Sequence, residues 1–265
     1  AYLQTSPVVY VAYETNWKPF EYDENGEASG ITPDVIRAIG KETGITFKFI
    51  ESSSTQELYD SMGSKPSDLI IAVSYDYLWA NNHDLIVTQP YVSGSIMRVT
   101  KNADVDPSSV AIVSSTYLAN EIVQAYPEME AVKYATFDEC INAVAAGNAD
   151  CTFLNYYQAN YYRALTDYSS FIYRPVDTIS QSISLGITKE SNPILLDILS
   201  KSLQRIQDNE LQSILSEDTV ISEPASLQKF VKHYPLQASV IVTVFMILIA
   251  ILLITAAGSK VRERR

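Results

Sequence analysis

Asp68-Leu69-Ile70-Ile71-Ala72-Val73 is a short apolar run with polar residues on both sides. Such a run is typical of a strand that is buried on both faces of a parallel sheet. Two further predicted strands precede it, Val8–Tyr13 and Ile45–Ile50, and a predicted helix over Gln56–Met62 leads into it. This alternation of strand and helix predicts right-handed crossovers and a parallel α/β sheet.

Turn and capping residues mark the ends of these elements. Asn25-Gly26 follows Phe20-Glu21-Tyr22 and predicts a tight hairpin. Thr32-Pro33 predicts an N-cap followed by proline at the first helical position. The helix that begins there has an apolar stripe, and Gly44 is expected to end it.

A second α/β unit follows the first. The elements predicted in it are, in chain order, a strand over 110–113, helices over 121–126 and 137–146, strands over 150–154 and 182–187, and closing helices over 193–207 and 211–215. The sequence therefore predicts two α/β lobes.

The C-terminal part is different in character. No charged side chain occurs from Pro235 to Ser259, and 240–254 is almost unbroken Val, Ile, Leu, Met and Phe. A run of this length is sufficient to cross ~30 Å of hydrocarbon as a helix. We predict a single transmembrane α-helix over 236–257, preceded by a linker over 217–235.

Basic residues indicate the orientation of this span. Lys229 and Lys232 lie before it, whereas Lys260, Arg262, Arg264 and Arg265 follow it within six positions. This contrast favours a cytoplasmic stub over 258–265 and an extracytoplasmic location for residues 1–235. The first residues lack the basic and apolar regions of a signal peptide, so we expect the chain to be a piece of a longer protein.

Composition and motifs exclude several functions. A net charge of −12 without a basic face disfavours nucleic-acid binding. No CxxC, HExxH, GxSxG or phosphate-binding glycine loop occurs, and the cysteines have no plausible histidine partner, so we predict no enzyme activity, no cofactor and no metal. For Cys140 and Cys151 two interpretations stay open, a disulfide and two small buried thiols.

Taken in order, the segments of the soluble part resemble the family 3 extracellular solute-binding domains, which have the type II periplasmic-binding-protein (Venus-flytrap) fold. The resemblance covers about Val8 to Leu215 and is carried by Trp17–Tyr22, Asn25-Gly26, Gly30–Val35, Asp68–Ala72, Gln89–Tyr91 and Ala143–Asp150. It implies a first lobe over 8–98 and 186–216, a second lobe over 102–182, and a ligand cleft between them that closes by a hinge.

A span after the last lobe makes the chain resemble the tethered members of this family, the sensor modules of bacterial receptor kinases and diguanylate cyclases. That resemblance implies a membrane-proximal module, a tandem solute-binding module N-terminal to it, and a homodimeric receptor. The alternatives are a binding domain fused to an ABC-type permease and a ligand-free module for protein interaction or dimerisation.

The resemblance also implies the residues of the cleft. The expected ligand-binding residues are Glu14, Trp17, Ser74, Tyr75, Thr116, Asn155, Tyr156 and Gln158. Aromatic walls with amide and hydroxyl groups favour a neutral or weakly charged small solute. A structural interpretation stays open beside this one: Trp17 as a plug of the lobe interface, Glu14 as a solvated loop acid, and Tyr156 as a cleft-filling side chain.

Two charged positions of the amino-acid-binding members are absent. The arginine that clamps the ligand carboxylate falls on Ala80 or Asn81, and the aspartate that takes the ligand ammonium falls on Asn155. Burying the charges of an amino acid without partners costs several kcal/mol, so an ordinary free α-amino acid is not the expected ligand.

Overall fold

The computed structural model of the protein describes residues 8–61, 69–103, 106–114, 116–206 and 208–219, together with Leu3, Ser239 and Thr243. Residues 1–221 form one compact unit and residues 222–265 another. The fold given below is that of the first unit.

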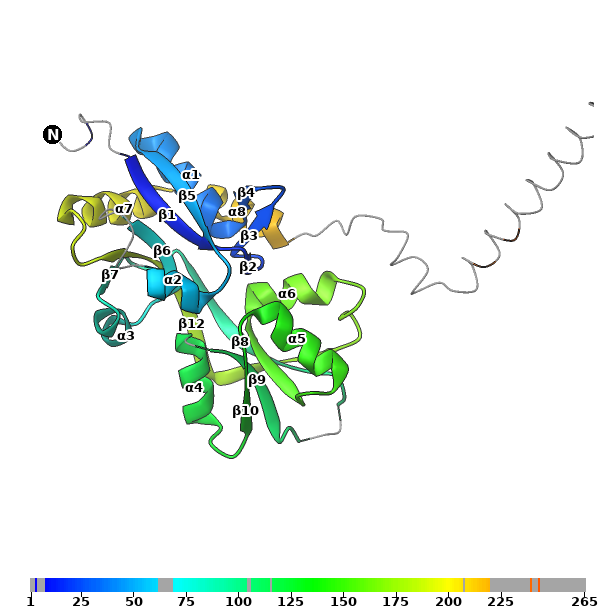
Figure 1. Ribbon diagram of the computed structural model, residues 1–265. Coiled ribbons are helices and arrows are strands. Elements are labelled where there is room, and N and C mark those ends of the chain that lie inside the picture. The colour runs from blue at the N-terminus through cyan, green and yellow to red at the C-terminus, as the bar shows by residue number, and fades with distance from the viewer. Residues whose placement is uncertain are drawn as a thin grey trace, which may run out of the picture. The chain divides into compact units, whose positions relative to one another are not determined.

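Three parallel strands form one half of the main sheet (Figure 1). β1 (Val8–Glu14) pairs with β5 (Thr46–Ser52) on one side and with β6 (Leu69–Ser74) on the other. α1 (Ile31–Thr43) connects β1 to β5, and α2 (Thr55–Ser61) follows β5. The predicted parallel α/β arrangement of this part is confirmed.

A small three-stranded sheet follows β1. It consists of β2 (Asn16–Trp17), β3 (Glu21–Glu24) and β4 (Glu27–Ser29). Asn25 and Gly26 join β3 to β4 with φ angles of 58° and 87°, which confirms the predicted tight hairpin.

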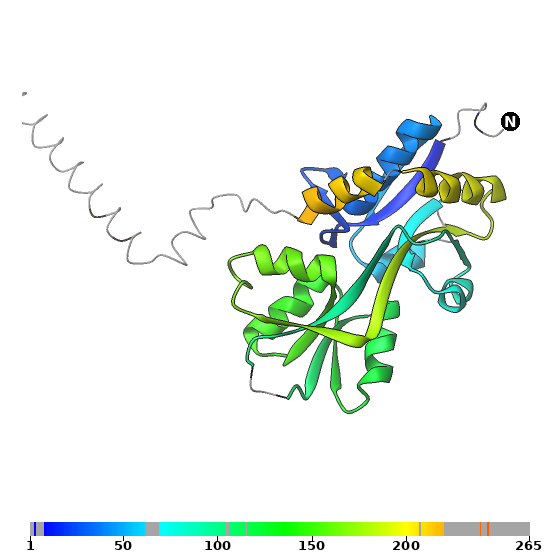
Figure 2. The ribbon, with the colours of Figure 1, turned by 180° about the vertical axis from the view of Figure 1, so that it is seen from behind.

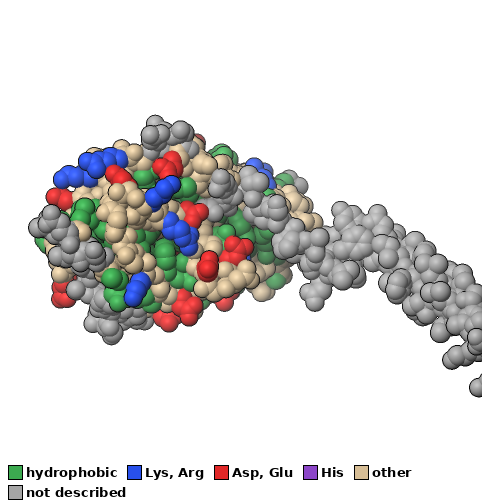
Figure 3. Space-filling model, turned by 90° about the horizontal axis from the view of Figure 1, so that it is seen from above, with side chains coloured by type: hydrophobic (Ala, Val, Ile, Leu, Met, Phe, Trp, Pro, Cys, Tyr) green, Lys and Arg blue, Asp and Glu red, His purple; other side chains and the backbone are tan. Residues whose placement is uncertain are grey.

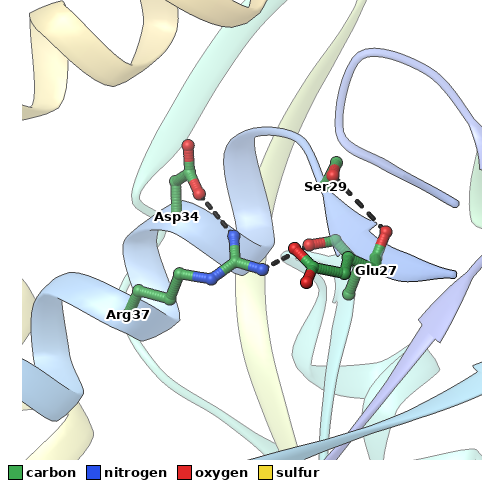
Figure 4. Close-up of polar contacts among 5 residues, drawn as sticks. Glu27, Ser29, Asp34 and Arg37 are labelled. Carbon is green, nitrogen blue, oxygen red and sulfur yellow. Dashed lines mark hydrogen bonds and ion pairs between the residues drawn. The ribbon is translucent and has the colours of Figure 1, made fainter. Parts of the chain in front are cut away.

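Arg37 on α1 attaches this small sheet to the helix (Figure 4). Its guanidinium donates to the Asp34 carboxylate at 2.6 Å and to the Ala28 carbonyl, and it lies 5.2 Å from the ring centroid of Phe49. The small sheet that carries Trp17 on β2 is therefore fixed to α1.

The N-terminus of α1 differs from the prediction. Gly30, with φ 109°, is the N-cap, and no side chain caps the helix. Thr32 lies inside the first turn, where its N–H donates to the Phe20 carbonyl at 3.0 Å and its hydroxyl bonds to that of Tyr91 at 2.8 Å. Thr32 is wrong as a cap because the backbone of the preceding loop already satisfies the helix amides. Gly44 ends the helix in the left-handed conformation, as predicted.

The other half of the sheet has the same alternation of strand and helix. β9 (Ser109–Val113) pairs in parallel with β10 (Glu130–Tyr134) and β11 (Cys151–Asn155). Three helices accompany these strands, namely α4 (Tyr117–Ala125), α5 (Phe137–Ala146) and α6 (Tyr156–Ala164). α5 has the predicted bounds, whereas α6 was not predicted.

Two long antiparallel strands cross between the halves. β8 (Val92–Thr100) and the 17-residue β12 (Ile172–Thr188) pair along most of their length, with a register shift between Val176 and Ser180. The full order is β10-β9-β11-β8-β12-β6-β1-β5, with β7 (Leu85–Val87) beside β12. The prediction identified only 182–187 of β12.

The two halves form the two lobes seen in Figure 1. We call β1–β7 with α1–α3, α7 and α8 the first lobe, and β9–β11 with α4–α6 the second lobe; α3 is Tyr77–Asn82. Figure 2 shows α7 (Pro193–Arg205) and α8 (Asp208–Thr219) on the first lobe, where both contact α1. α8 reaches Thr219, so residues 217–219, predicted as the start of the linker, are helical.

Charged side chains of both signs are interspersed on the face of the molecule seen in Figure 3. Within the described part of the chain, no helix has the length and apolarity to cross a membrane. The predicted span over 236–257 lies outside the described residues, apart from Ser239 and Thr243.

Candidate functional site

A small cavity lies between the lobes, with walls from both of them. Its volume is about 30 Å³, which is sufficient for a water molecule or a group of similar size. The first lobe contributes β1, β6 and the first turns of α2 and α3, and the second lobe contributes the starts of α4 and α5. The lining residues are Glu14, Trp17, Thr55, Ala72, Val73, Ser74, Trp79, Thr116, Tyr117, Phe137 and Gln181.

Glu14 is the acidic side chain of this cavity. It is the last residue of β1, and its register partner on β5 is Ser52. The Thr55 hydroxyl donates to Glu14 Oε1 at 2.7 Å. Although the residue as a whole is partly exposed, its carboxyl group is surrounded by protein, and this burial raises its pKa to about 7 against the opposing effect of the Thr55 hydrogen bond. Glu14 is therefore not a solvated loop acid.

A second carboxyl group, that of Glu21 on β3, lies directly behind Glu14. Glu21 Oε2 accepts the backbone N–H of Glu14 at 2.9 Å, and Glu21 is 1% exposed. Burial holds the pKa of this carboxyl well above its usual range, and the neighbouring Glu14 adds to the effect. The two acids together make this side of the cleft a place that favours protons or cations.

Aromatic side chains hold the lobes against one another. Trp17 of the first lobe stacks on Phe137 of the second, with ring centroids 6.4 Å apart and planes at 20°. Phe20 contacts Trp17 at 4.9 Å and meets Tyr157 of the second lobe edge to face at 6.2 Å. Trp17 thus lines the cavity and also fills the interface between the lobes, and its part in ligand binding stays a prediction.

Asn155 lies in a polar chain that crosses between the lobes, rather than in the cavity wall. Its Nδ2 donates to Gln181 Oε1 at 3.4 Å, and Gln181 Nε2 donates to Ser74 Oγ at 2.8 Å. Gln181 belongs to the crossing strand β12, while Ser74 ends β6 and Asn155 ends β11. All three residues are buried.

Asn155 and Gln158 also form the capping box of α6. The Asn155 Oδ1 accepts the Tyr157 N–H at 3.1 Å, and Gln158 Oε1 accepts the Asn155 N–H at 3.2 Å. Both residues are completely buried. Neither residue is among those that line the small cavity, and their part in ligand binding stays a prediction.

Two expected tyrosines also lie outside the cavity wall. Tyr156 is 46% exposed and contacts Tyr157, and Tyr75 contacts the ring of Tyr77 on α3. The structure therefore brings Glu14, Trp17, Ser74 and Thr116 of the expected residues to the cavity.

Thr116 is placed by its role at the start of α4. Its hydroxyl accepts the Ala119 N–H at 3.1 Å and donates to the Val113 carbonyl at 3.0 Å. The hydroxyl both donates and accepts a hydrogen bond within the protein. Thr116 therefore contributes a polar side chain of fixed position to the cavity wall, and its hydroxyl proton is already used.

Several wall residues were not predicted. Thr55, Tyr117 and Phe137 are the first residues of α2, α4 and α5. First turns of helices that follow parallel strands gather at the carboxyl edge of the sheet, and this rule would have identified them. Gln181 lies in the middle of a strand, where no local pattern marks it, and Trp79 lies inside α3.

A larger, open hollow of about 760 Å³ lies beside the cavity. Ser54 and Gln56 belong to its wall, together with residues of β10 and α5. Because Thr55 between them faces the small cavity, the first turn of α2 separates the two spaces.

The residues expected at the positions of the amino-acid clamp can be located in the structure. Ala80 and Asn81 lie on α3, where Ala80 is buried and Asn81 is exposed, and neither lines the cavity. Among the described residues that line the cavity there is no arginine, lysine or histidine. In the described part of the chain no cluster of side chains suits a metal ion.

The cysteines are free thiols, which decides between the two interpretations left open. The Cys140 thiol on α5 lies close to the Thr152 side chain, whereas Cys151 Sγ lies 3.6 Å from the Ser109 carbonyl. Cys151 and Thr152 are consecutive on β11 and point to opposite faces of the sheet. Cys140 therefore packs on the face away from Cys151, and no bridge forms.

Comparisons with known proteins agree with this architecture. The sequence profile of the bacterial extracellular solute-binding proteins, family 3, matches residues 9–217. The virulence sensor protein BvgS of Bordetella bronchiseptica is 27% identical over 229 residues, which are 81% of this chain and 18% of that protein. The chain thus spans under a fifth of the length of this relative.

Solved structures give the same result. The periplasmic VFT2 domain of Bordetella pertussis BvgS superposes with a TM-score of 0.70 at 26% identity, over 82% of this chain and 95% of that one. The whole BvgS periplasmic domain of the same organism gives a TM-score of 0.75 at 23% identity, over 88% of this chain and 46% of that one.

These likenesses agree with a two-lobed, non-enzymatic binding module. With a family profile that matches most of its length, the chain belongs to the bacterial extracellular solute-binding proteins, family 3.

Proposed function

We propose that this chain is the extracytoplasmic ligand-sensing segment of a single-pass bacterial receptor, which binds a small solute between its lobes. The observation that carries the proposal is the interlobe cavity, with Glu14 and Trp17 from one lobe and Phe137 from the other. A solute that contacts all three is bound more tightly by the closed lobes than by open ones, so it shifts the population toward closure. The similarity to BvgS, a sensor protein, supports signalling over transport.

The proposed path of the signal runs through the C-terminal part. In this proposal, the lobes are residues 8–98 with 186–216 and residues 102–182, and closure changes the position of α7 and α8. The linker that follows α8 transmits this change to a transmembrane helix over 236–257 and to a cytoplasmic stub over 258–265. Residues 1–235 are extracytoplasmic in this arrangement, the receptor is a homodimer, and a tandem solute-binding module precedes the segment.

A thermal-shift screen of the 265-residue chain in detergent tests solute binding. We expect some solutes to raise the melting temperature, because a ligand that binds only the folded state stabilises it. Trp17→Ala should remove the shift, while Tyr77→Ala, at an exposed position outside the cavity, should keep it. If no solute of any chemical class produces a shift, the chain is a ligand-free interaction module instead.

Spin labels on either side of residues 236–257 test transmission. We expect the distance distribution between the labels of two chains to change when the solute binds. A solute that closes the lobes without any change at these labels contradicts the signalling path. The coding sequence beyond Arg265 separates the rival functions, because a kinase or cyclase domain is expected for a receptor and further spans for a permease.

A further inference from the structure

The charge of the cavity wall restricts the ligand. Glu14 is the acid in the wall, and no described residue of the wall carries a positive charge. An anionic group bound there has no counter-ion, and burying it unpaired costs several kcal/mol. A cationic group, in contrast, meets the Glu14 carboxyl group directly, and no positive charge among the described wall residues repels it.

The remaining walls suit a cation equally well. Trp17, Trp79, Tyr117 and Phe137 contribute ring surfaces to a space of about 30 Å³. Aromatic faces attract ammonium groups through the ring quadrupole, and most strongly where water is excluded. A space of this size admits an ammonium group.

A third feature indicates a neutral acceptor beside the cation. The indole Nε1–H of Trp17 is buried and has no hydrogen-bond partner. Buried donors without partners are rare in native proteins and cost about 1–3 kcal/mol. An oxygen atom of the ligand would satisfy this N–H, and a hydroxyl or amide oxygen would do so without adding a negative charge.

We propose that the interlobe cleft takes a small organic amine without a carboxylate, whose ammonium group pairs with Glu14 and whose neutral oxygen accepts the indole N–H of Trp17. The proposal rests on the proposed solute-binding function and names the ligand class for it. A zwitterionic amino acid fits less well, because its carboxylate finds no cation among the described residues of the cavity wall.

Calorimetric titration of the 265-residue chain in detergent tests the proposal, above the Glu14 pKa of about 7 so that the carboxylate is ionised. The probes are ethanolamine, its uncharged analogue ethylene glycol, its carboxylated analogue glycine, and methylamine, which lacks the oxygen. We expect ethanolamine to bind, methylamine to bind more weakly, and ethylene glycol and glycine to show no heat of binding at millimolar concentration.

Two matched variants identify the roles of the residues. Glu14→Gln keeps the shape of the side chain and should weaken ethanolamine binding at least ~30-fold, because it removes one partner of a buried charge pair. The exposed Glu128→Gln should leave binding unchanged. Trp17→Phe keeps an aromatic ring without the N–H, and it should weaken ethanolamine about fivefold while leaving methylamine unchanged. Circular dichroism and melting temperature verify that each variant folds.

The outcomes distinguish a failure of the amine proposal from a failure of the proposed solute-binding function. If glycine or ethylene glycol binds as tightly as ethanolamine, or if only non-amine solutes from the screen bind, the amine proposal is overturned while the solute-binding function stands. If no solute binds at all, both are overturned. Amine binding that is insensitive to Glu14→Gln also overturns the proposal, since the amine then lies elsewhere.

Discussion

The indole of Trp17 and the ring of Phe137 stack with centroids 6.4 Å apart, and they belong to different lobes. Trp17 ends β2 and is 6% exposed, and Phe137 begins α5 and is equally buried. The contact closes the cleft over the cavity, so it links the relative position of the lobes to the identity of two side chains. Opening of the lobes must separate these rings.

Trp17→Ala should shift the lobes toward an open arrangement and lower the free energy of unfolding by about 3 kcal/mol. The physical reason is the loss of a buried aromatic side chain, which leaves a void between the lobes. Small-angle scattering should show a larger radius of gyration, and urea unfolding gives the stability. Tyr77→Ala is the control, because Tyr77 is 61% exposed and its loss should cost under about 0.5 kcal/mol. An unchanged radius of gyration would contradict the role of Trp17 in closure.

Glu14→Gln should change how stability depends on pH. The folded state raises the Glu14 pKa from 4.5 to about 7, so between these values the folded state binds more protons than the unfolded state. Stability is therefore highest at low pH and falls as the pH rises through about 7, by an amount on the order of 3 kcal/mol. Glutamine has no charged form, so the variant should lose this fall and be more stable than the parent above neutral pH.

Urea unfolding at about pH 5 and about pH 8 measures the effect. Glu21 contributes a slope of the same sign, and it remains in the variant, so part of the pH dependence should persist. Glu128→Gln, at an exposed position, should follow the parent at both pH values. Identical pH profiles for Glu14→Gln and the parent would show that the Glu14 carboxyl is not buried.

Gln181→Ala should loosen the connection between the lobes. The substitution removes the link between Asn155 and Ser74 and leaves two buried polar groups without that partner. We expect a loss of about 2 kcal/mol of stability and a broader distribution of interlobe distances in spin-label measurements. Gln89→Ala, at an exposed position, is the control. A normal distance distribution in Gln181→Ala would mean that the polar chain does not restrain the lobes.

Gly30→Ala should be far more destabilising than Gly26→Ala, although both glycines have positive φ. At Gly26 an added Cβ meets nothing within 4 Å, so only the backbone conformation is penalised, by about 1 kcal/mol. At Gly30 the Cβ lies 2.6 Å from the Pro19 carbonyl oxygen, and the backbone must move. Thermal unfolding should place the Gly30 variant well below the Gly26 variant; equal melting temperatures would refute the close approach of these backbones.

Cys140 and Cys151 should resist thiol reagents in the folded protein. Both are fully buried, and desolvation raises the pKa of each thiol to about 12, so neither is ionised at neutral pH. Titration with a chromogenic disulfide reagent should detect both thiols only after denaturation. A reductant should leave the melting temperature unchanged, whereas a reductant-dependent melting temperature would indicate a bridge.

Local sequence was sufficient for much of the fold. The apolar run at 69–73, the Asn25-Gly26 turn and the α5 helix that begins at Phe137 were all predicted correctly. In each case the signal and the structure concern residues that are neighbours in the chain, because periodicity and turn chemistry act over a few residues. α6 was not predicted, although Asn155 and Gln158 have the spacing of a capping box.

The sequence by itself determined two α/β lobes of a solute-binding family, a cleft with Glu14 and Trp17 in it, and the absence of the charges that clamp an amino acid. Only the tertiary structure decided which side chains meet in that cleft. Gln181 reaches Ser74 across 107 positions of sequence, and Phe137 meets Trp17 from the opposite lobe. The reason is that burial, which shifts the Glu14 pKa and leaves the Trp17 N–H unpaired, depends on contacts between distant segments that no local pattern records.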